Sequence, residues 1–386
     1  MTSVVKQQAD TLAWTYNIMF DLKLLPSRKL IKFNQQLPFF KWYYPFDTDE
    51  DRLPNPFLPL LAIKSLQTRR CAVYVHVPFC ETICSFCPFT RGTYSSETEI
   101  QNYVAALPLE IDLKRRFVGR CKVDVIFVGG GIPSLLSPHQ IESLGAAIHS
   151  NFDTRSLKEF TFESEVKSVT RGKLEAMHSI GVNRVSFGAQ TFSDSYRKIF
   201  SLDASVAQVV NAAKLINERF DYTNVDMIYG MAGQTPKDLY QDAREALNLQ
   251  TTTVDFYPLN NLAAQTRMHR TMRAVGLQHL PATERVQHRI RLDEFLRAQG
   301  YAPINGYSYS LAVGSQREVV QHSPKFYYHD VVYGYHDDAI IGYGSSALTQ
   351  LPGYNLYNAA DRADYVSRLL DKQILPFEAF AIPDCP

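Results

Sequence analysis

The feature that most constrains the fold of this chain is a regular alternation of two kinds of segment, which begins at residue 72. Short runs rich in β-branched and aromatic residues alternate with amphipathic stretches long enough to form helices of several turns. Strands separated by such helices predict βαβ units and therefore a parallel sheet. The predicted strands are 72–77, 123–128, 159–163, 184–187, 224–228 and 253–257, and the predicted helices are 98–117, 139–150, 171–180, 206–218 and 236–247.

Six such units are too few for a closed barrel of eight, so we expect an α/β fold in the form of a partial (β/α)6 barrel. Residues 71–260 would form this barrel, and residues 1–70 would be an N-terminal extension packed on it. Residues 261–386 are predicted to be an α+β region on the substrate side. Its predicted helices are 283–299 and 362–372, and its predicted strands are 301–310 and 339–343.

Composition excludes several classes of protein. Hydrophobic residues make up 45% of the 386, which permits a sizeable core and excludes global disorder. The 40 Lys and Arg against 39 Asp and Glu give a net charge of +1, which argues against a protein that coats nucleic acid. No apolar run approaches the roughly 18 residues of a membrane helix, and residues 1–20 lack the apolar core of a secretory signal. We therefore expect a cytoplasmic protein with no membrane or nucleic-acid partner, in which the six cysteines are not paired as disulfides.

Three of the cysteines follow the first predicted strand directly. Cys80, Cys84 and Cys87 fall within eight residues of one another, at spacings of four and three. Three thiolates suit a soft metal centre, either zinc or iron–sulfur. Structural zinc sites usually have four ligands in two pairs, and no second pair lies near in the sequence. A 4Fe–4S cluster held by three cysteines leaves one iron open to a small chelating ligand, and we favour that interpretation.

This cysteine spacing, with the aromatic residue Phe86 directly before the last cysteine, resembles the signature of the radical S-adenosylmethionine (SAM) superfamily. The string Tyr-x-His-x-Pro-Phe-Cys that begins at Tyr74 is similar to the HemN-like branch of that superfamily. This branch includes oxygen-independent coproporphyrinogen III oxidases, haem-trafficking relatives and class C methyltransferases. The resemblance implies a radical SAM barrel followed by a HemN-like α+β tail. It also implies a 4Fe–4S cluster on the three cysteines and SAM, with two SAM molecules expected in this branch.

Further motifs follow the later strands, as expected for a site at the carboxyl ends of parallel strands. Glycine lets a backbone approach a ligand closely, a strand-end glutamate can pair with an ammonium group, and an aspartate can accept from two ribose hydroxyls. Glu163 fits the family's spacing to the later Gly-Val-Asn-Arg string better than Glu165 does. The resemblance implies that the cofactor-binding residues are Tyr74, Phe86, Gly130, Gly131, Glu163, Gln190 and Asp226.

The sequence departs from the family at two positions. Ile132 stands where the family usually has threonine, so only backbone contacts are expected there. About twelve residues after Gln190 the family often has an arginine that clamps a carboxylate, but Ser201 and Leu202 stand here. Arg197 would replace that arginine only if its helix were shifted.

Family chemistry implies that one electron, from a donor such as flavodoxin or ferredoxin, cleaves SAM to a 5′-deoxyadenosyl radical that abstracts hydrogen from a substrate carbon. We expect the substrate to be a small, conjugated molecule. The preferred interpretation is C-methylation, or methylene transfer with cyclopropanation, at an unsaturated carbon, using a second SAM. The alternatives are oxidative decarboxylation, as in an oxygen-independent coproporphyrinogen III oxidase, and a haem-binding chaperone. The sequence assigns no catalytic residue.

A tyrosine-rich stretch suggests where the substrate binds. Tyr301, Tyr307 and Tyr309 all have odd numbers, so they would share one face of the strand predicted at 301–310. Such a face could cover a flat, partly polar substrate. The alternative is that these rings pack the C-terminal region against the barrel. We expect Tyr307 and Tyr309 to contact the substrate.

Overall fold

The computed structural model describes residues 49–62, 70–259, 265–312, 326–333 and 337–382. The chain divides into two units, 1–38 and 39–386, and the first lies outside the described residues. Most of the predicted N-terminal extension also lies outside them. None of the helices in the described ranges is long and apolar enough to cross a membrane.

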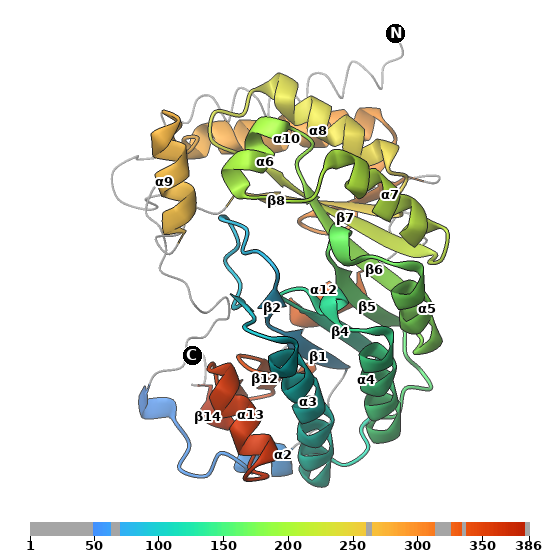
Figure 1. Ribbon diagram of the computed structural model, residues 1–386, viewed down its shortest axis with the longest axis vertical. Coiled ribbons are helices and arrows are strands. Elements are labelled where there is room, and N and C mark those ends of the chain that lie inside the picture. The colour runs from blue at the N-terminus through green and yellow to red at the C-terminus, as the bar shows by residue number, and fades with distance from the viewer. Residues whose placement is uncertain (1–48, 63–69, 260–264, 313–325, 334–336, 383–386) are drawn as a thin grey trace. The chain divides into compact units, whose positions relative to one another are not determined.

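A single mixed sheet organises the described part of the larger unit (Figure 1). All six predicted parallel strands are present, with their ends shifted by at most three residues. They pair in sequence order and in parallel, which confirms the predicted α/β fold; the sheet does not close on itself. These strands are β1 (Cys71–Val77), β4 (Val125–Gly130), β5 (Glu159–Ser164), β6 (Arg184–Gln190), β7 (Tyr222–Tyr229) and β8 (Thr253–Pro258).

The C-terminal region extends this sheet at both edges. Strand β11 (Ala339–Tyr343), which the sequence predicts, pairs in parallel with β1. Antiparallel strands β12 (Leu348–Leu351), β13 (Tyr354–Asn358) and β14 (Phe377–Ala381) continue outward from it. The C-terminal region therefore shares one sheet with the barrel strands.

The prediction of one strand over residues 301–310 is wrong. The segment forms two short antiparallel strands, β9 (Tyr301–Pro303) and β10 (Ser308–Leu311), at the β8 edge of the sheet. Asn305 makes the reversal, because its side-chain oxygen accepts from the backbone N–H groups of Tyr307 and Ser308, both at 2.8 Å. Odd residue numbers indicate a shared face only within one uninterrupted strand. The turn interrupts the segment, so the three tyrosines do not share one face.

Helices cover the outer face of the sheet (Figure 1). Three of them begin with a reciprocal capping box, formed by Ser137 with Gln140, Ser205 with Gln208 and Thr235 with Asp238. The helices of the βα units are α3 (Glu97–Val118), α4 (Pro138–Asn151), α5 (Arg171–Ser179), α6 (Asp194–Phe200), α7 (Val206–Asn217) and α8 (Pro236–Asn248). Helices α9 (Thr266–Ala274), α10 (Ala282–Ala298), α12 (Tyr327–Val332) and α13 (Arg362–Leu370) follow.

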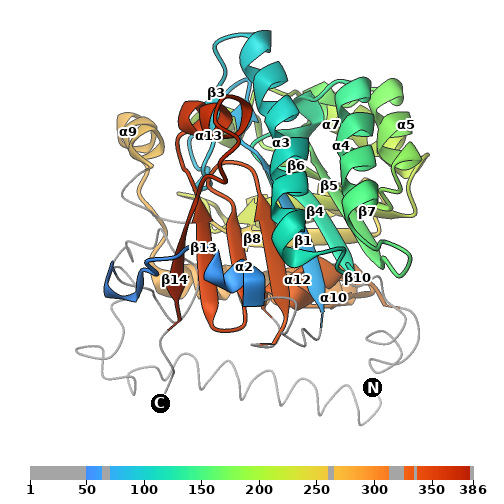
Figure 2. The same cartoon turned by 90° about the horizontal axis from the view of Figure 1, so that it is seen from below.

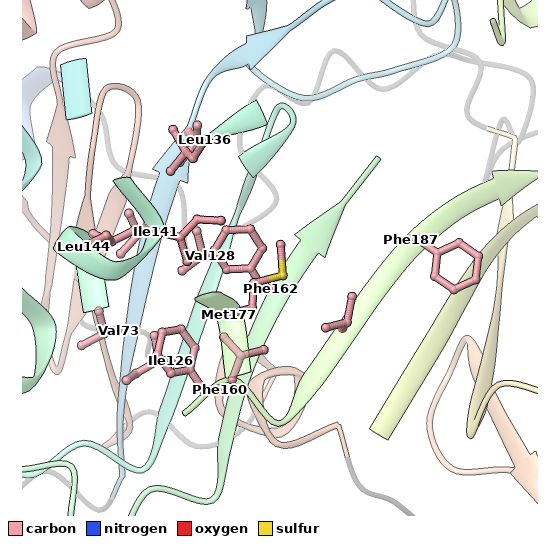
Figure 3. Packing of buried hydrophobic residues seen from close by; sticks show 14 of the residues in the cluster. Val73, Ile126, Val128, Leu136, Ile141, Leu144, Phe160, Phe162, Met177 and Phe187 are labelled. Atoms are coloured by element: carbon pink, nitrogen blue, oxygen red, sulfur yellow. The ribbon is translucent and has the colours of Figure 1, made fainter. Parts of the chain in front are cut away.

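The main core lies between these helices and the outward-facing side chains of the strands. Val73, Ile126 and Phe160 point from the sheet toward Ile141 and Leu144 of α4 (Figure 3). Inward-facing residues alternate with these, and α12 packs against them from the other side, where Val331 joins Ala72 and Val125 (Figure 2). Both faces of the first strands are therefore buried, which explains their almost continuous apolar sequence.

The remaining short elements complete the larger unit. Strands β2 (Phe79–Cys80) and β3 (Gly92–Thr93) form a separate parallel pair that encloses the cysteine loop. Single 3-10 turns lie at Asp49–Asp51, Pro133–Leu135 and Val166–Ser168. Helix α2 (Leu58–Ala62) follows Phe57, whose ring stacks on Phe117 of α3 with centroids 5.1 Å apart.

A buried polar network joins α3 to the C-terminal strands. The ammonium group of Lys114 lies 2.6 Å from Glu110 Oε1 and donates to the carbonyl of Gly342, also at 2.6 Å. Glu110 also accepts from the Tyr365 hydroxyl at 2.6 Å and from Asn358 Nδ2 at 2.7 Å. Both charged side chains are 0% exposed, so each depends on the other for compensation of its charge.

We expect Lys114→Ala to lower the free energy of unfolding by about 3–5 kcal/mol, because it leaves the Glu110 carboxylate buried without its cation. Chemical denaturation of the purified chain measures the change. The matched control is Arg116→Ala, which removes an exposed ion pair with Asp112 one turn along the same helix and should change stability by less than about 1 kcal/mol. Equal losses in the two variants would contradict this account of the network.

Candidate active site

The three clustered cysteines lie on one loop that leaves the carboxyl end of β1. Cys80 ends the short strand β2, and Cys84 and Cys87 follow it. The loop is fixed to the C-terminal end of α6, because Ser85 donates from its backbone N–H to the carbonyl of Phe200 and from its hydroxyl to the carbonyl of Ile199, both at 3.0 Å. The predicted ligands therefore stand on a loop that the neighbouring β6 unit supports.

The three thiols are largely buried and influence one another. Burial, followed by the neighbouring thiols, raises the pKa of Cys80 and of Cys84 to about 12. In the part of the chain that the structure describes, no group of three or more His, Cys, Asp or Glu side chains is arranged as a metal site. The donor chemistry nevertheless fits an iron–sulfur cluster, because three adjacent soft thiolates on one loop are the ligands that such clusters take.

The glycine-rich segment after β4 packs directly on the cysteine loop. Gly130 has φ +115°, and a Cβ atom there would lie 2.6 Å from the ring of His76. A Cβ on Gly131 would lie 2.5 Å from the backbone oxygen of Phe79. Backbone bonds from Gly131 to the Val77 carbonyl and from Ile132 to the Phe79 carbonyl, both 2.7 Å, join the segment to β1 and β2. These two glycines are thus required by packing, whatever ligand contacts they make.

Tyr74 lies on the inner face of β1, at the edge of an aromatic cluster. Its ring stacks with Phe127 and Tyr328, with centroids 6.1 and 6.2 Å apart. Its hydroxyl shares a hydrogen bond of 2.8 Å with Nδ1 of His76. Burial lowers the pKa of His76 to about 4, so this imidazole is neutral at pH 7. Whether Tyr74 touches the cofactor stays a prediction.

Two of the predicted acids face the inside of the sheet. Glu163 accepts a hydrogen bond from the backbone N–H of Gly130 at 3.2 Å, and burial raises its pKa to about 7. Asp226 accepts from Asn224 Nδ2 at 2.8 Å and from the Ser186 hydroxyl at 3.3 Å. Burial, then the charge of Asp255, then that of Glu163, raise the pKa of Asp226 well above its ordinary value. The two carboxylates are therefore close enough to interact, and the positive charge of Arg184 offsets the rise of their pKa values only in part.

Glu165 has a different environment from Glu163. Its carboxylate accepts from the backbone N–H groups of Lys167 and Ser168, at 2.9 and 3.1 Å, and so caps the short 3-10 turn that follows β5. This structural role agrees with the choice of Glu163 as the candidate ligand for SAM, a choice that stays a prediction.

Gln190 occupies an unusual backbone conformation at the end of β6. Its φ is +67°, and the pairing of β6 with β7 shifts register between Gly188 and Gln190. The side-chain amide folds back over Gly188, which has no Cβ to obstruct it. A left-handed conformation at a non-glycine residue is costly and is concentrated at functional sites, so this geometry favours the predicted role of Gln190.

Phe86 packs behind the cysteine loop. Its ring meets that of Phe200 edge-on, with centroids 5.4 Å apart, and its carbonyl accepts from the side-chain amide of Gln265. Gln265 lies directly before α9 and is a contact that the sequence did not predict. Its only signal would have been a polar residue beside a helix start, which is too common to single it out.

The guanidinium of Arg197 is bound to backbone carbonyls. It is 5% exposed, and its guanidinium donates to the carbonyls of Ala189 at 3.0 Å, Thr191 at 2.7 Å and Ala204. These bonds hold together the loops that follow β6 and α6. These carbonyls occupy the Arg197 guanidinium in the described structure, so a role as the substitute clamp would still require a shifted helix.

The two predicted substrate tyrosines separate. Tyr309 is 0% exposed on the outer face of the sheet, where its hydroxyl donates to Asp293 of α10 at 3.0 Å. Tyr307 precedes β10, and its ring lies against that of Tyr257 on the inner face, with centroids 5.0 Å apart. The expectation that Tyr309 lines the substrate side is therefore corrected, since that ring is core packing, and Tyr307 alone remains a candidate.

Comparison with known proteins agrees with this arrangement. Residues 74–246 match the radical SAM superfamily. A coproporphyrinogen III oxidase, HemN from Escherichia coli, superposes on 83% of this chain and 74% of its own with a TM-score of 0.71, at 22% identity. The chain is 31% identical over 215 residues to the haem chaperone HemW of Bacillus subtilis, which is 55% of this chain and 56% of that protein. It is 27% identical over 319 residues to the oxygen-independent coproporphyrinogen III oxidase of Paracoccus denitrificans, which is 78% of this chain and 66% of that protein.

Residues 74–246 are a radical SAM domain, and the relatives named above support a HemN-like radical SAM family for the chain. It spans about half to two thirds of the length of the curated relatives it matches. Family membership implies a 4Fe–4S cluster and SAM. Among the residues of this radical SAM domain, Cys80, Cys84 and Cys87 would hold the cluster, and the number of SAM molecules stays a prediction.

We expect the anaerobically reconstituted chain to contain about four irons and four sulfides. Replacing Cys80, Cys84 and Cys87 together by Ser should remove them and the absorption of thiolate-to-iron charge transfer. The matched control is Cys121→Ser, which removes a thiol outside the loop and should leave the iron content unchanged. A wild-type chain that binds a single zinc ion and stays colourless would contradict the assignment.

We expect Asp226→Asn and Glu163→Gln to weaken SAM binding about ten- to a hundredfold, because each removes one charge-assisted contact worth about 1.5–3 kcal/mol. Equilibrium dialysis with labelled SAM measures the affinity, and iron analysis should show an intact cluster. Glu165→Gln is the control, since that carboxylate caps a turn. If Glu165→Gln weakens binding and Glu163→Gln does not, the assignment of the two acids must be exchanged.

Proposed function

We propose that this chain is a radical SAM enzyme that abstracts a hydrogen atom from a small-molecule substrate. When bound, the cluster and SAM supply a 5′-deoxyadenosyl radical by one-electron cleavage of the C5′–S bond, with the electron coming from a donor such as flavodoxin or ferredoxin. The observation that supports this proposal is the placement of the three-cysteine loop and two half-buried carboxylates with raised pKa values along one edge of a parallel sheet.

In this proposal the chain's own residues bind and orient SAM. The Glu163 carboxylate would accept from the ammonium group, whose positive charge would favour the ionised form of this acid. Asp226 would accept from the ribose hydroxyls, and Gln190 would donate and accept near the ribose and methionine. The backbone groups of Gly130 and Gly131 would contact the methionine end. Apolar side chains of α6 and α9, including Phe200 and Met268, would exclude water from the cysteine loop.

The net reaction that we propose is an oxidation in the manner of the coproporphyrinogen III oxidases. Those relatives match 76–81% of this chain, whereas the matches named as haem chaperones cover 49–55%. C-methylation or cyclopropanation with a second SAM, which the sequence favoured, finds no support among these curated relatives. It is therefore the alternative that the experiment must separate from oxidation.

The test is an anaerobic assay of the reconstituted chain with a chemical or flavodoxin reductant, SAM and coproporphyrinogen III as the probe. We expect substrate-dependent 5′-deoxyadenosine and carbon dioxide, with no S-adenosylhomocysteine. Asp226→Asn should lower the yield of 5′-deoxyadenosine at least tenfold when the SAM concentration saturates the wild type but not the variant. Arg116→Ala, on the exposed face of α3, is the control and should keep the wild-type yield.

Other products would overturn the proposed oxidation. S-adenosylhomocysteine together with a methylated product would establish methyl transfer instead. Stoichiometric haem uptake with no cleavage of SAM in the presence of reductant would establish a binding protein. Cleavage of SAM that coproporphyrinogen III does not stimulate would reject this probe as the substrate.

A further inference from the structure

Asp255 is a buried acid that the binding of SAM, as proposed above, does not use. It lies on β8, one strand beyond Asp226, and the two residues are register partners in the parallel sheet. On its other side it is paired with Ser308 of β10. Its neighbours Val254 and Phe256 belong to the outer core, so the side chain of Asp255 points to the inner face. Asp255 thus stands between Asp226 and the C-terminal hairpin, on the side away from the cysteine loop.

One oxygen of this carboxylate has no partner in the described structure. Asp255 is 1% exposed, and the Tyr257 hydroxyl donates to its Oδ2 at 3.0 Å. Its Oδ1 is fully buried and receives no hydrogen bond. Leaving a buried acceptor unsatisfied is costly, and such groups in native proteins call for an explanation, of which a bound ligand is one.

No described cation makes an ion pair with Asp255. Arg184 is on the same face, but it stands at the start of β6, where its guanidinium lies 4.0 Å from the centre of the Phe326 ring. No ion pair within 4.0 Å joins Arg184 to Asp255 among the described residues. In the proposed complex, the ammonium group of SAM would bind Glu163 and the ribose hydroxyls of SAM would bind Asp226. The charge of Arg184 acts on the neighbouring Tyr257, but no described N–H or O–H group donates to Oδ1 of Asp255.

Aromatic rings stand beside the unpartnered oxygen. The hydrogen bond to Asp255 holds Tyr257 in place. The ring centroids of Tyr257 and Tyr307 are 5.0 Å apart. His329 of α12 meets Tyr307 edge-on at 6.4 Å, and the charge of Asp255 acts on the pKa of that imidazole. Burial lowers the pKa of His329, so the ring is neutral at pH 7 and adds no positive charge beside Asp255. Flat rings next to a carboxylate suit a planar cation, which they attract through their faces.

We propose that Asp255 is the anchor of the substrate site and that its Oδ1 accepts a hydrogen bond from a nitrogen-bound hydrogen of a flat, cationic or N–H-rich substrate group, with Tyr257 and Tyr307 alongside. This proposal rests on the proposed function, because the ligand of Asp255 would be the substrate of the proposed radical SAM reaction. It adds the chemical class of the group that is recognised and a specificity-determining residue.

The experiment measures binding by equilibrium dialysis of the full, anaerobically reconstituted chain with SAM present. The probe is benzamidinium, a flat ring with a forked pair of N–H donors that matches a carboxylate. Neutral benzamide and anionic benzoate are the matched probes. We expect the wild type to bind benzamidinium saturably and at least tenfold more tightly than either. Asp255→Asn should reduce that affinity at least tenfold, and Tyr307→Leu about threefold or more, because it removes a ring.

Two controls separate recognition from folding. Asp293→Asn makes the same chemical change on the outer side of the hairpin, where the amide oxygen can still accept from Tyr309. It should leave benzamidinium binding unchanged. Asp255→Asn should keep the wild-type iron content and a SAM affinity within twofold of wild type, which shows that the site next to it is intact.

Several results would overturn the proposal. Benzamidinium binding that is absent in the wild type, or equal in Asp255→Asn, would remove the evidence for an N–H ligand and favour a proton shared between Asp255 and Asp226. A large loss of SAM affinity in Asp255→Asn would assign this carboxylate to the ribose. Because these measurements need no turnover, they remain valid if the proposed oxidation fails, and the turnover assay with coproporphyrinogen III can fail on its own.

Discussion

The parallel register of the six central strands is the constraint on which the candidate site depends. Each strand delivers its alternate side chains to the same inner face, and each loop after a strand leaves from the same edge. Register pairs Glu163 with Ser186, Gly188 with Asp226 and Asp226 with Asp255. A slip of one residue in this register would move each of these side chains from the inner face to the outer core. The hydrophobic pattern that sets the register therefore also determines which polar groups face the site.

That register produces an inner face with more negative than positive groups. Asp255 is buried and Glu163 and Asp226 are half-buried, and the raised pKa values of Glu163 and Asp226 show that loss of solvent disfavours their charged forms. A core selected only for stability would avoid such an arrangement. SAM carries an ammonium and a sulfonium group, so it would bring the positive charge that this face lacks. The carboxylates would lower the free energy of unfolding of the free chain, and binding of a cationic ligand would offset that loss.

The sequence predicts the central sheet and the cysteine loop well, because both follow from short-range patterns. Hydrophobic alternation identifies each βαβ unit, and the three cysteines lie within eight residues. It fails where the answer depends on a turn or a distant partner. The reversal at Asn305 moves Tyr309 to the outer core, and the buried bonds of Arg197 to three backbone carbonyls follow no local pattern. Asp255 escapes notice for the same reason, since its unpartnered oxygen is visible only when the neighbouring strands are in place.

The C-terminal strands are tied to the same edge of the sheet that carries the cysteine loop. The Tyr103 hydroxyl of α3 donates to the carbonyl of His76, near the end of β1, and accepts from the backbone N–H of Ser345, which follows β11. Two turns further along α3, Glu110 accepts from the backbone N–H of Gly344 at 2.8 Å. The network around Lys114 therefore does more than stabilise a helix. It holds β11 beside β1, so that one set of buried bonds joins the segment before the predicted cluster ligands to the C-terminal region.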